Sequence, residues 1–413
     1  MTRQKSWRPQ SVVSAKSSVH PPDVGSELRL VDLHTARNLH LFVLNTEAMP
    51  GRRVPAVPLD PTLCKRCQAE KPSINVRTEP LCTGCFSKYV STKVVKRMES
   101  FRVRHSDPGK QRTLLLPLSH GPCSTALLHL LHQHLQGQTE KTGRTGFKLH
   151  VLHVKHLEEE EEEEDNDGPL LNKVRERYPT HAFTSIPLAD VLSCEGVSEL
   201  LQHDSSSRGE NGDEASNGRT NLEKVFASLT SPTSKDDIRN ILIRKLVVTF
   251  ATQNDCEAIL WGDSTTHLAE RTLSETAKGR GSSLPWIVAD GDALHGVPFY
   301  FPMRDLLSKE IASFATLIQP PLDDLIHTEP SKPAVSTKNT TIDDLMRQYF
   351  ESVEQEYPSI VANVVKTTSK LQTVPVDEIE AQCELCDVPL DGEAAPARSR
   401  LCYGCIRTLP GVA

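Results

Sequence analysis

Short apolar runs alternate with longer amphipathic segments over residues 113–315, which is typical of strands joined by helices. Four runs predict strands, at residues 113–118, 147–154, 181–188 and 257–261, because each is short and apolar or alternating. Helices are predicted from residue 126 and over residues 236–251, the latter with Ser234 as a candidate N-cap. Strands that alternate with helices favour a parallel sheet covered on both faces, so this region is expected to form one α/β domain.

The segments around this domain differ from it in composition. Residues 1–60 are expected to be poorly ordered, and two polar surface insertions are predicted at residues 158–168 and 203–220. The predicted organisation is an N-terminal segment (1–60), a cysteine module (61–90), a basic connector (91–112), the α/β domain (113–320), a linker with a short helix at 342–353 (321–380) and a second cysteine module (381–413).

The formal net charge of −7 gives a poor guide to partners, because residues 158–165 supply eight acids in one run. Without that run the chain is close to neutral, so an RNA partner is compatible with it. No stretch approaches the apolar length needed to cross a bilayer, and no membrane partner is expected. The first 22 residues carry four basic residues and no acid, but Pro9, Pro21 and Pro22 would break a transit helix. A disordered tail and a cytoplasmic location are the favoured interpretation.

Eight of the eleven cysteines form C-x-x-C pairs, and the pairs group into two quartets. Within a quartet the pairs are separated by fourteen or fifteen residues, close to the spacing of four-cysteine zinc sites. Each pair can turn both sulfurs toward one point, so that two pairs close a tetrahedron around a structural zinc ion. The predicted metal ligands are Cys64, Cys67, Cys82 and Cys85, and Cys383, Cys386, Cys402 and Cys405.

Several other interpretations of these cysteines stay open. An iron–sulfur cluster is the alternative cofactor for either quartet, and redox-active dithiols are a further one. Gly84 and Gly404 stand just before the last ligand, where a positive φ is expected. The remaining Cys123, Cys194 and Cys256 are expected to be ordinary buried or loop thiols.

A small-residue loop follows the first strand of the α/β domain and reads Ser119-His-Gly-Pro-Cys-Ser124. Backbone N–H groups and the dipole of the next helix make such a loop a natural phosphate cradle, although a tight turn explains it equally well. The loop resembles a decayed form of the S-G-G-x-D-S pyrophosphatase loop of ATP-dependent tRNA-thiolating enzymes. Ser119, Gly121 and Ser124 match that pattern. His120 replaces a glycine, Cys123 replaces the aspartate, and Pro122 stands where lysine is common.

A second segment strengthens this resemblance. Residues 262–269 read G-D-S-T-T-H-L-A and align with a signature that usually resembles G-H-N-x-D-D, without its paired aspartates. Lys278-Gly-Arg-Gly281, Pro302-Met-Arg-Asp305 and Lys309-Glu310 fall where the same enzymes have their closing elements. Over roughly residues 60–410 the chain resembles the cytoplasmic tRNA 2-thiolation protein 2 family. The residues expected to form a degenerate nucleotide site are Ser119, Gly121, Ser124, Gly262 and Asp263.

The resemblance implies a fold and a set of partners. The fold is a parallel-sheet ATP-pyrophosphatase-like (adenine nucleotide alpha hydrolase-like) α/β domain flanked by two small four-cysteine zinc modules. The partner is a catalytically intact paralogue in a heterodimer that takes sulfur from a thiocarboxylated ubiquitin-like carrier. The product is the 2-thiolated wobble uridine (mcm5s2U) of cytosolic tRNA for Lys, Glu and Gln. A link to conjugation of the carrier to proteins stays open.

The departures from the family's active pattern predict a subunit that is not catalytic alone. The lost aspartate and lysine remove groups expected near a triphosphate, and Pro122 deletes one backbone donor. ATP and Mg²⁺ are therefore expected on the partner, or bound weakly here. The alternatives are an active sulfurtransferase that uses Cys123, at a predicted helix N-terminus, as its nucleophile, and a zinc scaffold unrelated to nucleotides.

The basic connector supplies the candidates for contact with tRNA. Clustered cations suit phosphate contact, and a solvated charged helix explains them equally well. The candidates are Lys93, Lys96, Arg97, Arg102, Arg104 and Lys110.

Overall fold

The computed structural model describes most of the chain from residue 60 onward. The described ranges are 60–107, 109–157, 168–194, 196–201, 214–291, 294, 296–327, 337–373, 375–390 and 394–409. They belong to one compact unit that begins at Pro58. The predictions for residues 1–59 and for the acidic insertion up to residue 167 lie outside the described residues.

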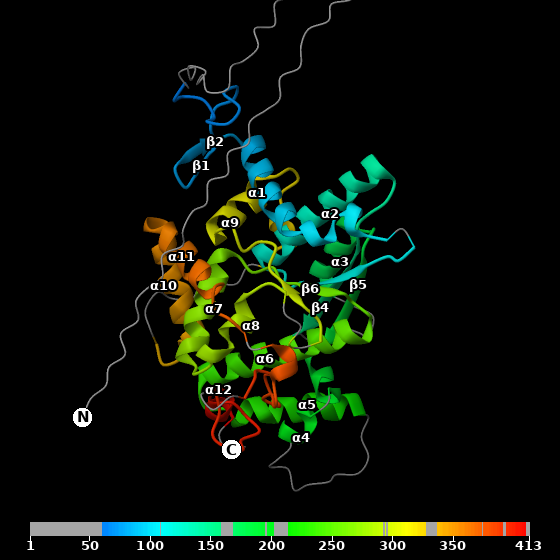
Figure 1. Ribbon diagram of the computed structural model, residues 1–413, viewed down its shortest axis with the longest axis vertical. Coiled ribbons are helices and arrows are strands. Elements are labelled where there is room, and N and C mark those ends of the chain that lie inside the picture. The colour runs from blue at the N-terminus through cyan, green and yellow to red at the C-terminus, as the bar shows by residue number, and fades with distance from the viewer. Residues whose placement is uncertain are drawn as a thin grey trace, which may run out of the picture. The chain divides into compact units, whose positions relative to one another are not determined.

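The centre of this unit is a parallel sheet, as the sequence predicts (Figure 1). Within the described residues it has five strands in the order β5-β4-β3-β6-β7. Their bounds are β3 Thr113–Pro117, β4 Lys148–Lys155, β5 Ala182–Pro187, β6 Ala258–Leu260 and β7 Phe299–Tyr300. The first four coincide with the predicted strands. The fifth has only two residues, too few to form a hydrophobic pattern.

Side chains on successive strand residues enter two separate cores. Leu114 and Leu116 of β3 pack into one core, and Leu115 packs into the other. This alternation of faces is the expected period of two along a strand. A sheet buried on both sides explains why β3 reads as a continuous apolar run.

Helices cover both faces of the sheet (Figure 1). The helices packed in the first core are α1 (Thr83–Arg97), α2 (Pro122–Thr142), α3 (Gly168–Arg177) and α9 (Ser308–Leu317). Those of the second core are α4 (Val197–Leu201), α5 (Glu214–Ser228), α6 (Pro232–Gln253), α7 (Thr265–Ala277), α8 (Leu284–Val288), α10 (Ile342–Glu356), α11 (Pro358–Thr368) and α12 (Tyr403–Thr408). In the part of the chain described here, no helix is long and apolar enough to cross a membrane.

Local sequence accounts for where several of these helices begin. Ser264 caps α7 by accepting a hydrogen bond from the His267 backbone N–H at 3.1 Å. Thr341 and Asp344 form a capping box at the start of α10. The prediction of Ser234 as the cap of α6 is wrong. The N-cap is Ser231, because Pro232 fits the first helical turn, where its missing N–H costs nothing.

Three predicted connecting segments contain more helix than their composition indicates. Helix α5 begins at Glu214, inside the insertion predicted at residues 203–220. Helix α1 extends from the first cysteine module through much of the basic connector. The predicted linker at 321–380 contains α10 and also α11, which both pack against α7. These helices are stabilised by packing against the rest of the domain. The composition of a segment does not contain that contribution.

The two cysteine modules pack on opposite faces of the sheet. Cys64 and Cys82 belong to the first core, and the antiparallel strands β1 (Ile74–Val76) and β2 (Glu79–Leu81) lie between them in the chain. Cys383 and Cys402 belong to the second core, beside α6 and α12. Both modules are thus integral to the compact unit.

Candidate functional site

The two loops predicted to bind a nucleotide meet at the carboxyl ends of neighbouring strands. β3 lies between β4 and β6, and the chain leaves β3 for α2 on one face and β6 for α7 on the other. This divergence is the topological switch point where α/β sheets bind ligands. A Cβ built on Gly262 would lie 2.9 Å from Ser124 Cα and 3.0 Å from Ser124 N. Glycine at 262 therefore permits the backbone contact between the loops.

The loop after β3 contains a residue in the left-handed region of backbone conformation. His120 has a φ of 56°, a left-handed conformation that is unusual for a side chain other than glycine. His120 is buried, and its ring lies edge-on to that of His153 with centroids 4.8 Å apart. Pro122 occupies the first turn of α2 and contributes no N–H donor there.

Polar groups in this loop bond mainly to one another. The Ser119 and Ser124 hydroxyls are 3.1 Å apart, and Ser124 Oγ donates to the Gly121 carbonyl at 3.3 Å. Gly121 N–H in turn donates to Ser119 Oγ at 3.4 Å. The side-chain hydroxyls of this loop are thus engaged within the loop itself.

Asp263, the acid nearest the loop in the second segment, is held in an ion pair. Arg271 donates to both of its carboxylate oxygens, at 2.9 and 3.1 Å. Arg271 belongs to α7, and Asp263 lies just before that helix. Their two hydrogen bonds occupy the carboxylate oxygens that a magnesium ion would need. The structure thus places Ser119, Gly121, Ser124, Gly262 and Asp263 together, with the Asp263 carboxylate engaged by Arg271.

Cys123, the alternative nucleophile, is in an environment unsuited to a thiolate. It is buried near the N-terminus of α2. Burial raises the pKa of its thiol, and the negative charges of Asp263, Glu270 and Glu354 raise that pKa further, against the lowering effect of a hydrogen bond with Ser264. The thiol is consequently protonated at neutral pH, which opposes nucleophilic chemistry.

Both cysteine quartets assemble into compact groups. In each quartet all four Sγ atoms lie within 4.8 Å of one another. Cys67 and Cys82 bring their sulfurs to 3.7 Å, and Cys386 and Cys402 bring theirs to 3.6 Å. Each group could hold a metal ion.

The two quartets share one backbone design. The residue after the first pair is Gln68 in one module and Asp387 in the other, with φ of 50° and 60°. Its N–H donates to the carbonyl of the first cysteine, at 2.9 Å to Cys64 and 2.8 Å to Cys383. The positive φ predicted at Gly84 and Gly404 is therefore misplaced. Those glycines lie within α1 and α12, and the left-handed residue comes after the first knuckle instead.

Gly404 is required for a different reason. A Cβ on Gly404 would lie 2.6 Å from Arg280 Cγ and 2.8 Å from Arg280 Nη1. A Cβ on Gly84 would meet nothing within 4 Å. Only the C-terminal module is thus in close contact with an arginine of the α/β domain at this position.

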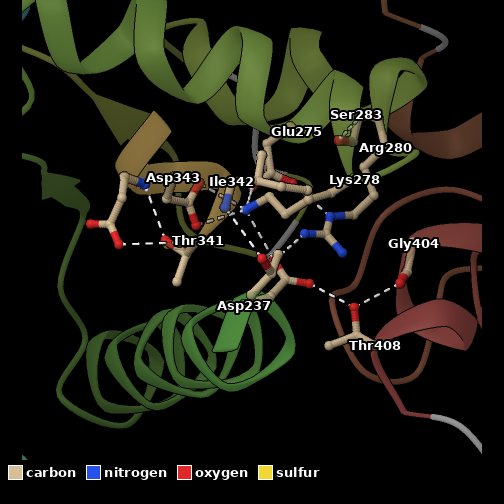
Figure 2. A network of polar contacts seen from close by, with 12 residues as sticks. Asp237, Glu275, Lys278, Arg280, Ser283, Thr341, Ile342, Asp343, Gly404 and Thr408 are labelled. Carbon is tan, nitrogen blue, oxygen red and sulfur yellow. Dashed lines mark hydrogen bonds and ion pairs between the residues drawn. The ribbon is translucent and has the colours of Figure 1, made fainter. Parts of the chain in front are cut away.

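That arginine belongs to a buried ion-pair network, shown in Figure 2, which connects four segments of the chain. Lys278 Nζ lies 3.1 Å from Asp237 of α6, 2.9 Å from Glu275 of α7 and 3.2 Å from Asp343 of α10. Arg280 pairs with Asp237 through Nη2 and with Glu275 through Nε at 2.6 Å. Thr408 of α12 donates to Asp237 at 2.8 Å and thereby attaches the C-terminal module.

The mutual attraction within this network outweighs the cost of burying its charges. Burial alone would raise the pKa of Glu275, but Arg280 and Lys278 lower it to about 2. Burial would lower the pKa of Lys278, but Glu275, Asp237 and Asp343 raise it above its ordinary value. Glu275, Lys278 and Arg280 are therefore ionised at neutral pH. Within the Lys278–Gly281 motif, Arg280 lies against Gly404 of the C-terminal module.

The cationic candidates for tRNA contact lie on or just after α1, and several already have partners within the chain. Arg97 donates to both carboxylate oxygens of Asp305, at 2.8 and 2.9 Å. Arg102 and Arg104 both pair with Glu99. The ammonium of Lys93 lies over the Tyr89 ring, 5.6 Å from its centroid. Lys96 and Lys110 are exposed.

Sequence reasoning missed Glu354 of α10. One carboxylate oxygen accepts from Thr266 at 2.8 Å, and the other accepts from the Lys309 backbone N–H at 2.8 Å. This buried carboxylate connects the starts of α7 and α9 beside the loop. A lone acid on an amphipathic helix gives no sequence signal for such a role.

Known proteins match this chain in sequence over most of its length. A family model described as cytoplasmic tRNA 2-thiolation protein 2 matches residues 341–399. A relative of that name from Phaeosphaeria nodorum is 43% identical over 388 residues, which cover 88% of this chain and 98% of the relative. The chain belongs to the cytoplasmic tRNA 2-thiolation protein 2 family. A second family member, from Sclerotinia sclerotiorum, is 44% identical over 73% of this chain and 80% of its own length.

A solved structure shares the fold of this family member. The U34-tRNA thiolase NcsA from Methanococcus maripaludis, with its [4Fe-4S] cluster, superposes with a TM-score of 0.52. The match covers 78% of this chain and 89% of the thiolase, at 14% identity. The predicted fold class is thereby confirmed as a parallel-sheet α/β fold that resembles this thiolase, with two cysteine groups that could bind metal.

Proposed function

We propose that this chain is a subunit of the complex that 2-thiolates the wobble uridine (mcm5s2U) of cytosolic tRNA for Lys, Glu and Gln. Membership of its family supports a role in tRNA thiolation, and the observation that carries the proposal is the match over 88% of the chain. The family's name also supports a cytoplasmic location.

The chain acts in a heterodimer with a catalytically intact paralogue. This assignment rests on the loop after β3, where the serine hydroxyls bond to each other and Asp263 is paired with Arg271. ATP and Mg²⁺ are held by the partner, or weakly here. The partner takes sulfur from a thiocarboxylated ubiquitin-like carrier, and a link to protein conjugation of that carrier is part of the same proposal. Cations of α1 that face solvent, such as Lys96, contact the tRNA backbone.

Each cysteine quartet holds one structural zinc ion in this proposal. A zinc–sulfur distance of about 2.3 Å places tetrahedral sulfurs about 3.8 Å apart. The Sγ–Sγ distances of 3.7 Å between Cys67 and Cys82 and 3.6 Å between Cys386 and Cys402 agree with that value. In a four-iron cluster each cysteine binds a different iron, which spreads the sulfurs more widely. The modules at residues 61–90 and 381–413 then brace the α/β domain at 113–320 from its two faces.

Protein purified under reducing conditions should contain about two zinc ions per chain, because both quartets offer four convergent thiol groups. Elemental analysis of the full chain measures this directly. The control is the Cys64→Ser variant, which should retain one ion in the intact C-terminal quartet. Iron in place of zinc, with a brown charge-transfer absorbance, would contradict zinc and leave the thiolation role untouched.

Cells that lack this chain should lose 2-thiouridine from the wobble position of the three cytosolic tRNAs. Sulfur in tRNA binds mercury, so thiolated tRNA is retarded in a mercury-containing gel. Cytosolic tRNA from the deletion strain should lose that retardation, and re-expression of the chain should restore it. Retardation that persists in the deletion strain would refute the proposed function.

The same strain distinguishes the alternative enzyme. Re-expressed Cys123→Ala should restore most thiolation, because burial keeps the Cys123 thiol protonated. Cys256→Ala, which removes another buried thiol of this domain, is the matched control for packing effects. Thiolation abolished by Cys123→Ala alone, in a protein present at normal levels, would instead identify Cys123 as a nucleophile.

A further inference from the structure

One nitrogen of a buried guanidinium is directed at the C-terminal cysteine module without a partner. Arg280 is 3% exposed, and two of its nitrogens are engaged by carboxylates. Its Nη1 has no hydrogen-bond partner among the residues that the structure describes. A buried donor that is left unpaired typically lowers the free energy of unfolding by about 1–3 kcal/mol, and by more when the donor is charged. We therefore expect Nη1 to have an acceptor.

The environment of Nη1 indicates which acceptor it meets. Nε and Nη2 are fixed by Glu275 and Asp237, and a planar guanidinium held at two nitrogens has a fixed third direction. That direction is toward α12, since Nη1 would lie 2.8 Å from a Cβ on Gly404 (Figure 2). Gly404 immediately precedes the ligand Cys405, so Nη1 lies against the last knuckle of the quartet.

The chemistry of the quartet provides the missing acceptor. A divalent ion bound by four thiolates leaves a surplus of negative charge on the sulfurs. We propose that Arg280 is a positioning residue for the C-terminal metal centre and that its Nη1 donates a charge-assisted hydrogen bond to a ligand thiolate, with Cys405 the nearest in the chain. The donor comes from the Lys278–Gly281 motif, so metal binding and docking of the module on the α/β domain stabilise each other.

The N-terminal quartet serves as an internal reference. The equivalent glycine, Gly84, would meet nothing within 4 Å if it carried a Cβ, so no side chain among the described residues covers that position. Removal of Arg280 should therefore weaken one metal centre of the two.

The test uses the full chain loaded with zinc or with cobalt(II) and compares Arg280→Lys with the wild type. A chelator competition measures release of each zinc ion, and the sulfur-to-cobalt charge-transfer band reports electron donation by the thiolates. In Arg280→Lys one ion of the two should be lost on the order of tenfold more readily, as for other groups that hydrogen-bond to metal ligands. Loss of the hydrogen bond should also move the charge-transfer band to longer wavelength.

Thr408→Val separates this hydrogen bond from simple docking. It removes the contact from Thr408 to Asp237 and leaves Arg280 in place. It should leave the charge-transfer band unshifted, whatever its effect on zinc release. The proposal is wrong if Arg280→Lys releases zinc at the wild-type rate. It is also wrong if Arg280→Lys releases zinc faster but leaves the charge-transfer band unshifted, as Thr408→Val should.

Discussion

Asp237→Ala should lower the free energy of unfolding by about 3–5 kcal/mol, the typical loss when one partner of a buried ion pair is removed. Asp237 is 2% exposed and accepts from Lys278, Arg280 and Thr408. Its removal leaves two buried cations short of a counter-charge and releases α12 from α6. The measurement is urea unfolding of the metal-loaded chain, followed by both tryptophan fluorescence and circular dichroism to test for a single transition.

Asp305→Ala is the matched control for this prediction. Asp305 also pairs with an arginine, Arg97, at 2.8 Å, but both side chains are more than a third exposed. Exposed pairs contribute at most about 1 kcal/mol, so this variant should unfold at nearly the wild-type urea concentration. Similar losses in the two variants would show that the buried network has no special role in stability.

Gly404→Ala should destabilise the C-terminal module, whereas Gly84→Ala should not. The new methyl group at 404 overlaps Arg280, whose guanidinium is held in place by Glu275 and Asp237. Overpacking of this kind costs about 1–3 kcal/mol, and the displacement should also make one metal ion easier to remove. At 84 the space is open and the residue is helical, so alanine should be neutral or stabilise by up to about 1 kcal/mol.

Chelator competition and urea unfolding on the two variants decide this prediction. Because the glycines occupy equivalent places in the two quartets, any general requirement of the knuckle for glycine would affect both alike. Equal sensitivity of Gly84 and Gly404 would therefore refute the explanation based on Arg280.

Much of the fold follows from local pattern. Strands β3, β4, β5 and β6 were predicted because each is a short run, either apolar throughout or alternating, as strands of a covered parallel sheet are. The quartets were predicted because a knuckle that directs two thiols at one point needs a fixed short spacing. The first residue of a helix was harder to predict from sequence, since several polar residues near a helix start can serve as the cap. At α6 the cap is Ser231 and not the predicted Ser234.

The sequence by itself determined the class of the domain and the membership of the two cysteine quartets, because both depend on residue type at short spacing. Only the tertiary structure decided what those parts do to one another. It placed the quartets on opposite faces of the sheet, closed the Ser119–Ser124 loop on itself and paired Asp263 with Arg271. It also turned Lys278 and Arg280 inward to carboxylates up to 65 residues away in the chain. Contacts between distant segments depend on how the helices pack, and that packing leaves no trace in any local pattern of residues.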